Sequence, residues 1–537
     1  MAFDFSIQAH IVLQFCPAGK RAGQAARAAG GVPLPLTRRD FQGTISQDMR
    51  YIGVNGDSMR QITLGLIVGN RDVFPAELAK KGREEIIALL AKENVNLVVL
   101  SPNDTPDGVV MTWKDAEKCA KLFHDMSNVI DGIFITLPNF GDERAVADSV
   151  KLSGLSVPVF VHAWPEKIGK YAIETRRDSF CGKLSICNNL KQYGISYSVG
   201  KSHVVDPSSE EFKKDLHWFV DVCRVVRGLR SARIGSIGER TTPFKTVRYS
   251  EKLLEAAGIS VESKSLVEIV DEINALADTD PRVEAKLSKL TGYLPNTKDV
   301  PGKAMKTTAK LGVALENWVT EYHLNSYAIQ CWSAMQGALK IFPCSIMSMM
   351  SDDMFPSACE VDVMGAVAMY ALQLAGGGPS ALFDWNNNYG EDPDKTVLFH
   401  CSNTALSFMK EAKAGLNAMA IKGNPHDSCF CTLHGTLKPG AVAWARFSTD
   451  DEKGRIVGCI GDGEITDDNV HTFGTTGVIK MPNTQKLMRF LAVNGFEHHM
   501  ALNYSPRTEV LYEATSTYLG WKIYHHNGED HTLFENW

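Results

Sequence analysis

Residues 359–384 read CEVDVMGAVAMYALQLAGGGPSALFD, and this stretch decides the fold class. The apolar run 364–375 predicts a helix, the glycines at 376–378 and Pro379 end it, and 381–384 predicts a short buried strand. Glu360 stands just before the helix, and Asp384 stands at the carboxyl end of the strand. Helix N-termini and strand C-termini share one edge of a parallel sheet, so we expect both acids to face one crevice.

Upstream of this stretch, short apolar runs alternate with helical segments from residue 62 onward. The pattern predicts strands at 62–68, 95–100, 132–136 and 157–162, and helices at 75–92 and 114–126. A helix at 209–227 and a strand at 233–237 open a second series, and β-rich runs such as 442–447 and 454–460 follow. The sequence therefore predicts an α/β protein with two doubly wound parallel-sheet domains followed by a β-rich C-terminal domain.

Composition changes along the chain suggest where these domains begin and end. Residues 1–50 carry several lysines and arginines and few acids, which we interpret as a disordered basic tail, with a transit peptide as the alternative. We expect an N-terminal α/β domain at 51–214 and a central α/β domain with the acid pair at 215–395. We expect a β-rich domain at 396–537, which supplies a histidine that binds a metal ion together with the acid pair.

The bulk composition narrows the class of protein. The chain has 537 residues, 44% of them hydrophobic and 22% charged, with a formal net charge of -6. These values are ordinary for a globular protein and give little electrostatic support for binding nucleic acid. No apolar run is long enough to cross a bilayer, and the 12 cysteines have no repeated spacing. We therefore expect a cytoplasmic protein with reduced thiols, acting on a small polar molecule.

The acid pair also admits an ordinary structural role. Glu360 could complement the dipole of the following helix, and Asp384 could open a turn. Apolar flanks make two neighbouring carboxylates costly, however, unless a cation or a proton neutralises them. Asp362 is given a supporting or capping role. A third ligand is offered by Gly495-Phe-Glu-His498, with His499 as the alternative, and this oxygen and nitrogen set suits Mn²⁺ and tolerates Mg²⁺ or Co²⁺.

Three stretches resemble the L-fucose isomerase and L-arabinose isomerase superfamily, in particular its L-fucose isomerase branch. They are Arg233-Ile-Gly-Ser-Ile-Gly-Glu-Arg240 with Phe244-Lys-Thr246, Cys359-Glu-Val-Asp362 through Leu382-Phe-Asp384, and Gly495-Phe-Glu-His498. The resemblance implies that Glu360, Asp384 and His498 hold the metal. It also implies three domains and a homohexamer with active sites at subunit boundaries.

The resemblance implies an aldose–ketose isomerase that acts on an open-chain sugar through an enediolate. Such a reaction moves one proton between adjacent carbons and another between their oxygens, so Glu360 and Asp384 are assigned as the acid–base pair as well as ligands. Candidate contacts to the sugar hydroxyls are the aromatic, amide and guanidinium side chains of Arg71, Trp332, Gln336, Asn386 and Asn387.

The sugar itself stays open at this point. The chain departs from L-fucose isomerase in a shorter interval between Asp384 and His498 and in the run Trp385-Asn-Asn-Asn-Tyr389. L-Fucose or D-arabinose is the first expectation, and a modified hexose such as sulfoquinovose is the alternative, for which a basic pocket is required. A non-catalytic sugar-binding protein would explain the α/β domains but not the acid pair.

Overall fold

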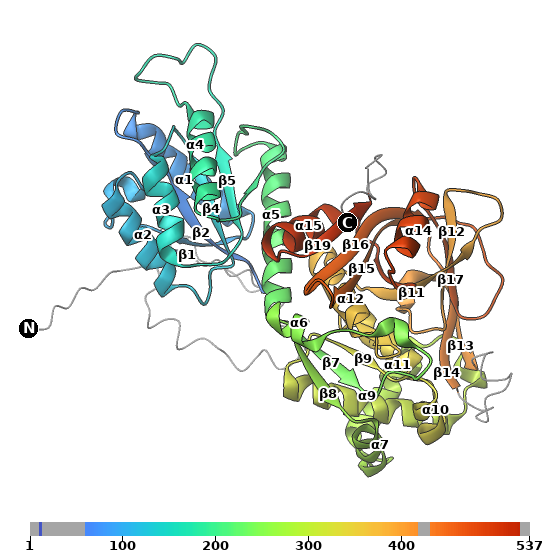
Figure 1. Ribbon diagram of the computed structural model, residues 1–537. Coiled ribbons are helices and arrows are strands. Elements are labelled where there is room, and N and C mark those ends of the chain that lie inside the picture. The colour runs from blue at the N-terminus through green and yellow to red at the C-terminus, as the bar shows by residue number, and fades with distance from the viewer. Residues whose placement is uncertain (1–9, 13–59, 417–429, 527–537) are drawn as a thin grey trace, which may run out of the picture. The chain divides into compact units, whose positions relative to one another are not determined.

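The computed structural model describes residues 10–12, 60–416 and 430–526, which fall into two compact units (Figure 1). The first unit contains Arg60–Val226 and the second contains Arg227 onward. Within the described part of the chain, no helix is long and apolar enough to span a membrane.

The first unit is built on one parallel sheet. Its strands are β2 (Thr63–Val68), β3 (Asn96–Val99), β4 (Gly132–Leu137), β5 (Val159–Ala163) and β6 (Ser198–Val199), in the order β3-β2-β4-β5-β6. Its helices are α1 (Ala76–Lys92), α2 (Trp113–Asp125), α3 (Glu143–Ser153), α4 (Ser179–Gln192) and α5 (Glu210–Arg230). The predicted strands and helices of this region correspond to these elements within a few residues.

Alternate residues of the strands bury opposite faces of this sheet. Ile133 and Ile135 belong to a core with α2, α3 and α4, whereas Leu66 and Phe134 belong to a core with α1 and α5. The strands read as continuous apolar runs because both faces are covered by helices. A capping box between Thr112 and Asp115 fixes the start of α2.

The predicted basic tail at 1–50 lies outside the described residues, with one exception. His10–Val12 forms β1, which pairs antiparallel with β3 at the edge of the sheet. A three-residue strand therefore stands where the sequence predicted no regular structure. The three residues of β1 are too few to form a pattern from which a strand can be recognised in the sequence.

The second unit begins with a smaller parallel sheet, in the order β10-β9-β7-β8. Its strands are β7 (Arg233–Ile237), β8 (Ser260–Lys264), β9 (Ser326–Ile329) and β10 (Ser357–Cys359). The helices of this part are α6 (Glu251–Ala256), α7 (Leu266–Ala275), α8 (Pro281–Tyr293), α9 (Gly302–Tyr322), α10 (Ala334–Leu339), α11 (Cys344–Asp352) and α12 (Val363–Gly376).

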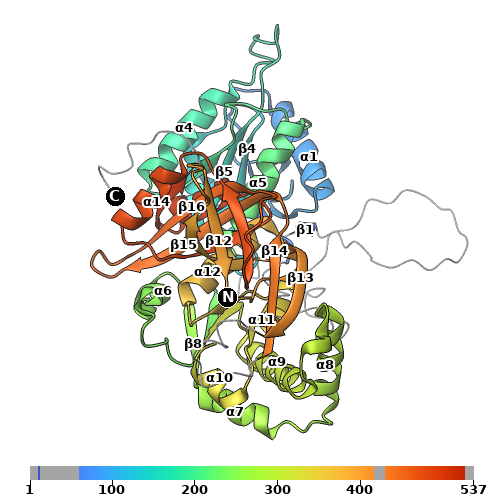
Figure 2. The same cartoon turned by 90° about the vertical axis from the view of Figure 1, so that its right-hand side faces the viewer.

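A nine-stranded sheet completes this unit, with its strands coloured orange to red in Figure 2. It contains β11 (Ala381–Asn388), β12 (Lys395–His400), β13 (Met409–Leu416), β14 (Phe430–Leu437), β15 (Gly440–Asp450), β16 (Arg455–Ile465), β17 (Thr475–Lys480), β18 (His499–Asn503) and β19 (Lys522–His526). Helices α14 (Thr484–Val493) and α15 (Thr508–Tyr512) accompany it. An additional β16–β17 pairing closes the run β17-β12-β11-β18-β15-β16 into a barrel. The predicted fold class is confirmed.

One expectation about the acid pair is wrong. Residues 381–384 do not continue the parallel sheet of β10, because β11 pairs antiparallel with β12 and β18 inside the nine-stranded sheet. Between the two sheets lies α12, whose residues from Val363 to Ala375 are all buried and which packs against β9 and β10 as well as β15 and β18. A buried antiparallel strand under such a helix shows the same unbroken apolar run as a parallel one, so its sequence does not reveal its sheet.

Candidate active site

Glu360 is held by a tight turn between β10 and α12. Glu360 and Val361 both have left-handed backbones, with φ angles of 63° and 58°. A β-branched residue such as Val361 rarely adopts this conformation, which costs on the order of 1–3 kcal/mol for each residue. Asp362 then begins the helix as its N-cap, where its side chain accepts a hydrogen bond from the backbone N–H of Gly365. The surrounding fold therefore stabilises a strained turn that carries an acid.

Asp384 reaches the same place from a different sheet. It lies directly opposite His499 in the antiparallel pairing of β11 with β18. Nε2 of His499 lies 3.4 Å from Oδ1 of Asp384 and 3.0 Å from Oε2 of Glu360. The imidazole, only 1% exposed, thus stands between the two carboxylates. Antiparallel register brings the acids together, in place of the shared parallel edge expected from the sequence.

The other nitrogen of His499 is held by a buried charge network. Nδ1 lies 2.8 Å from Oδ2 of Asp362, and NH1 of Arg446 donates to the same oxygen at 2.5 Å. Nε of Arg446 donates to Glu497 at 3.1 Å, and the hydroxyl of Ser448 donates to Glu497 at 2.6 Å. Burial raises the pKa of Asp362, but the charge of Arg446 and the hydrogen bond from His499 outweigh burial, so the net pKa is far below the usual value. Asp362 is therefore an anionic support for the His499 ring.

The protonation of the central groups follows from these contacts. Burial raises the pKa of Glu360, but the hydrogen bond and charge of His499 outweigh it and lower that pKa to about 2. Burial lowers the pKa of His499, but its contacts with Asp362 and Glu360 raise the pKa to about 10. Nε1 of Trp332 donates to Oε1 of Glu360 at 3.0 Å, which leaves Oε2 turned toward His499. The site keeps an ionised carboxylate in a nearly dry environment.

The donor atoms of this site suit a divalent cation. Donor atoms of Asp384, His400 and His499 all lie within 4.8 Å of one another, and so do those of Glu360, His400 and Cys401. Among the described residues, Oε2 of Glu360 and Oδ1 of Asp384 are buried oxygens that both face Nε2 of His499, at 3.0 Å and 3.4 Å. Carboxylates with imidazoles form a ligand set that first-row divalent metals accept. An imidazole that gives its other nitrogen to a carboxylate, as His499 does, is the usual arrangement of a metal ligand.

His498 occupies a more open position than His499. Its side chain is 42% exposed, and its Nε2 lies 3.7 Å from Oδ1 of Asp384. Its ring meets the edge of Phe244 at a centroid distance of 5.4 Å. Burial and the neighbouring charge of His499 lower the pKa of His498. Both histidines border the acid pair, and only His499 is anchored through its second nitrogen among the described contacts.

The residues that the sequence proposes as sugar contacts lie in different surroundings in the structure. Trp332 belongs to the site through Glu360, whereas Gln336 is 2% exposed and its amide donates to the backbone oxygen of Cys331 at 3.4 Å. Asn386 and Asn387 are exposed on the later part of β11 and hydrogen bond to each other at 2.8 Å. Arg71 belongs to the first unit, where it pairs with Glu143 at 2.8 Å and lies 4.3 Å from the ring centre of Phe140.

Two participants were missed by the sequence analysis. His400 ends β12, the strand beside β11, and the rule that picked Asp384 at a strand end could have found it. Arg446 lies in the middle of the strongly apolar strand β15 and is 1% exposed. A lone arginine in such a run is a signal of a buried ion pair, because an unpaired buried charge is prohibitively costly.

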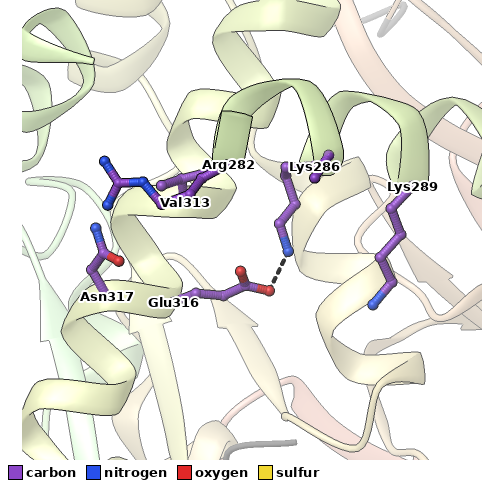
Figure 3. A pocket seen from close by; sticks show the side chains of 7 residues that line it. Arg282, Lys286, Lys289, Val313, Glu316 and Asn317 are labelled. Carbon is purple, nitrogen blue, oxygen red and sulfur yellow. Dashed lines mark hydrogen bonds and ion pairs between the residues drawn. The ribbon is translucent and has the colours of Figure 1, made fainter. Parts of the chain in front are cut away.

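A separate hollow lies between α8 and α9 (Figure 3). It has a volume of about 280 Å³ and is lined by Arg282, Ala285, Lys286, Lys289, Val313, Glu316 and Asn317. None of the predicted site residues lines it. Each of its cations has a carboxylate partner, since Arg282 pairs with Asp280, Lys286 with Glu316 and Lys289 with Asp353. The candidate active site is instead the cluster of acids and histidines around Glu360.

The sequence matches two family models. Residues 65–230 match the fucose/sulfoquinovose isomerase N-terminal domain, and residues 398–526 match the L-fucose isomerase C-terminal domain. The chain is 23% identical over 462 residues to a sulfoquinovose isomerase of Priestia aryabhattai, which covers 85% of this chain and 97% of that protein. It is 24% identical over 446 residues to a sulfoquinovose isomerase of Alkalicoccus urumqiensis, covering 82% and 95%.

The matched regions lie on both sides of the acid pair, and the same order of domains was expected from the sequence. The members of these families are aldose–ketose isomerases, which are intramolecular oxidoreductases. The chain belongs to the L-fucose isomerase-like family and is an aldose–ketose sugar isomerase.

Proposed function

We propose that this protein interconverts sulfoquinovose, a 6-sulfonated hexose, and the corresponding ketose with the help of a divalent cation. The observation that carries the reaction is the buried cluster of Glu360, Asp384 and His499. The names of the relatives support a sulfonated sugar, which replaces our first expectation of L-fucose or D-arabinose.

We propose Glu360, Asp384 and His499 as the metal ligands, with His400 as a fourth donor. His499 takes the place given to His498 in the sequence analysis because its Nε2 faces both carboxylates. Manganese is the preferred ion, since carboxylate oxygens and imidazoles suit it, and Mg²⁺ and Co²⁺ are the alternatives. When bound, the cation would stabilise negative charge that develops on the carbonyl and hydroxyl oxygens of the sugar.

The protein side chains carry the protons. In the aldose-to-ketose direction, one proton leaves C2 and arrives at C1, and another passes from the oxygen on C2 to the oxygen on C1. We assign these transfers to Glu360 and Asp384, one acting at the carbons and the other at the oxygens. Trp332 holds Oε1 of Glu360, so that Oε2 remains for the reaction. His499 separates the two carboxylates and is fixed in turn by Asp362.

The assembly and location remain part of the proposal. The family resemblance supports a homohexamer with sites at subunit boundaries, and the scattered cysteines, which are free thiols among the described residues, favour a cytoplasmic location. Arg71, Asn386, Asn387 and Gln336 stay candidates for contacts to the sugar hydroxyls.

A substrate panel tests the proposal. The purified protein is stripped of metal with a chelator, resupplied with Mn²⁺ and offered sulfoquinovose, L-fucose, D-arabinose, L-arabinose and L-rhamnose. We expect ketose to form fastest from sulfoquinovose, and formation to stop when the chelator is present. Turnover of L-fucose with no turnover of sulfoquinovose would overturn the proposed substrate.

A further inference from the structure

Recognition of a sulfonate demands a cation at some distance from the acid pair. The sulfonate keeps its negative charge at all ordinary pH values, and it sits on C6 whereas the reaction takes place at C1 and C2. Burying it without a positive partner would be costly. Because this requirement concerns a sulfonated sugar, the inference below rests on the proposed function.

The segment 238–248, between β7 and α6, borders the active site. The ring of Phe244 lies 5.4 Å from that of His498 and 5.6 Å from that of His499, measured between centroids. The backbone N–H of Phe244 donates to the carbonyl oxygen of Thr241 at 2.9 Å. This turn therefore places its aromatic ring against the two histidines.

A second set of contacts ties the same segment to Glu360. The hydroxyl of Thr241 donates to the carbonyl oxygen of Trp332 at 3.0 Å, and the indole of Trp332 donates to Glu360. The ring of Phe244 also meets the ring of Trp332 at a centroid distance of 5.9 Å. Trp332 thus links Thr241 to Glu360 through two hydrogen bonds.

Arg240 is anchored to the same point. NH1 of Arg240 donates to the carbonyl oxygens of Thr241 at 3.0 Å and of Thr242 at 3.2 Å. The carbonyl of Thr241 is the one that accepts from Phe244, so the guanidinium lies close to the turn whose ring touches the histidines. The side chain of Arg240 is half-buried, and its Nε and NH2 atoms take no part in these two hydrogen bonds.

The segment 238–248 carries three cations and one acid, Glu239, which directly precedes Arg240. Within the described part of the chain, Arg240, Lys245 and Arg248 form no ion pair with a carboxylate. Lys245 follows Phe244 directly and is exposed, and Arg248 donates through Nε to the carbonyl of Lys245 at 2.9 Å. The hollow between α8 and α9 offers the opposite case, because its three cations are all neutralised by acids.

We propose that Arg240 binds the sulfonate of the substrate, with Lys245 as a second cation. Guanidinium nitrogens in a planar fork match the oxygens of a tetrahedral anion and form charge-assisted hydrogen bonds with them. The anchoring of NH1 on two carbonyls orients the guanidinium before the sugar arrives, which reduces the entropy lost on binding. The acid pair then determines the reaction, and the segment 238–248 determines which sugar is accepted.

The test compares two sugars that differ only in the sulfonate. Sulfoquinovose and D-quinovose are offered to the wild type and to the Arg240→Met, Arg240→Lys and Arg282→Met variants, all loaded with Mn²⁺. Loss of charge-assisted hydrogen bonds should lower the selectivity for sulfoquinovose over D-quinovose in Arg240→Met by roughly 10- to 100-fold, mainly through KM. Arg240→Lys should restore part of the selectivity. Arg282→Met removes a cation of the α8–α9 hollow and should keep the wild-type selectivity.

The outcomes separate the inference from the function on which it rests. A wild type that isomerises sulfoquinovose, together with an Arg240→Met variant of unchanged selectivity, overturns the role of Arg240 and leaves the function standing. Equal losses on both sugars, accompanied by weaker Mn²⁺ binding in calorimetry, also overturn it, because Arg240 would then act only as a structural residue. A wild type that turns over other sugars but not sulfoquinovose overturns both proposals.

Discussion

Nδ1 of His499 lies 2.8 Å from Oδ2 of Asp362, although 137 positions separate the two residues along the chain. The carboxylate that caps α12 therefore also orients the imidazole on β18. An ionised acid at Nδ1 keeps a proton on that nitrogen and turns Nε2 toward the acid pair. One residue thus couples the geometry of the helix start to that of the proposed metal site.

Asp362→Asn should weaken metal binding more than it weakens the fold. The amide retains the size of the side chain but loses the charge that supports His499 and faces Arg446, and loss of such a support commonly costs 10- to 100-fold in metal affinity. Calorimetric titration with Mn²⁺ measures the effect. Asp353→Asn, which alters an exposed acid paired with Lys289, serves as the control. Unchanged Mn²⁺ affinity in Asp362→Asn would contradict the supporting role.

Glu360→Gln and Asp384→Asn should each abolish turnover while leaving the fold intact. Either change removes one proton carrier and one negative charge, and acid–base catalysis alone is worth on the order of 10²- to 10⁴-fold in rate. Ketose formation and circular dichroism are measured in parallel, with Glu321→Gln as a surface control. Near-normal activity in either variant would contradict the assignment of Glu360 and Asp384 as the acid–base pair.

The alternation of elements in the first unit could be predicted from sequence. Strands such as β2 and β4 are covered by helices on both sides, so each appears as an apolar run between amphipathic segments. The sheet of β11 could not be predicted, because its apolar residues are covered by α12 and look the same in either kind of sheet. The pairing that decides the matter, Asp384 opposite His499, joins distant parts of the chain.

The candidate site likewise contains residues that the sequence predicts and residues that it does not. Glu360 and Asp384 were found because each borders a strongly apolar segment, although Asp384 lies in the middle of β11 and not at its end. His400 and Arg446 each carry a local signal, a strand end and a lone arginine in an apolar strand, but the groups that they meet depend on which strands become neighbours, and local patterns do not contain that. The preference for His499 over its neighbour His498 came from burial and from the contact with Asp362, neither of which is visible in the dipeptide.

Replacement of His498 and His499, one at a time, should show which of them binds the metal. His499→Gln removes the nitrogen that faces both carboxylates, and we expect Mn²⁺ binding to fall below detection in calorimetry. His498→Gln should keep Mn²⁺ affinity within a few-fold, since that ring is 42% exposed and lies 3.7 Å from Asp384. The reverse pattern would return the ligand role to His498.

The stability of the first unit should fall on acidification because of His162. This residue is buried on β5, where Nε2 donates to the carbonyl of Val205 at 2.8 Å and Nδ1 accepts from the hydroxyl of Thr136 at 2.9 Å. That hydroxyl also accepts from the indole of Trp164 at 3.0 Å, so the neutral ring is fully engaged. Burial is the main cause that lowers the pKa of His162 from 6.5 to about 4.

The sign of the effect follows from which state binds the proton more readily. Above pH 6.5 neither the folded nor the unfolded state protonates His162 appreciably, so stability does not depend on it. Between pH 6.5 and about 4 the unfolded state gains the proton first, and the fold loses up to about 3 kcal/mol. Hydrogen exchange of β5 amides, corrected for intrinsic rates, should show protection falling through this window in the wild type. His162→Gln should flatten the dependence and His124→Gln on α2 should preserve it, whereas equal slopes in all three proteins would exclude His162 as the cause.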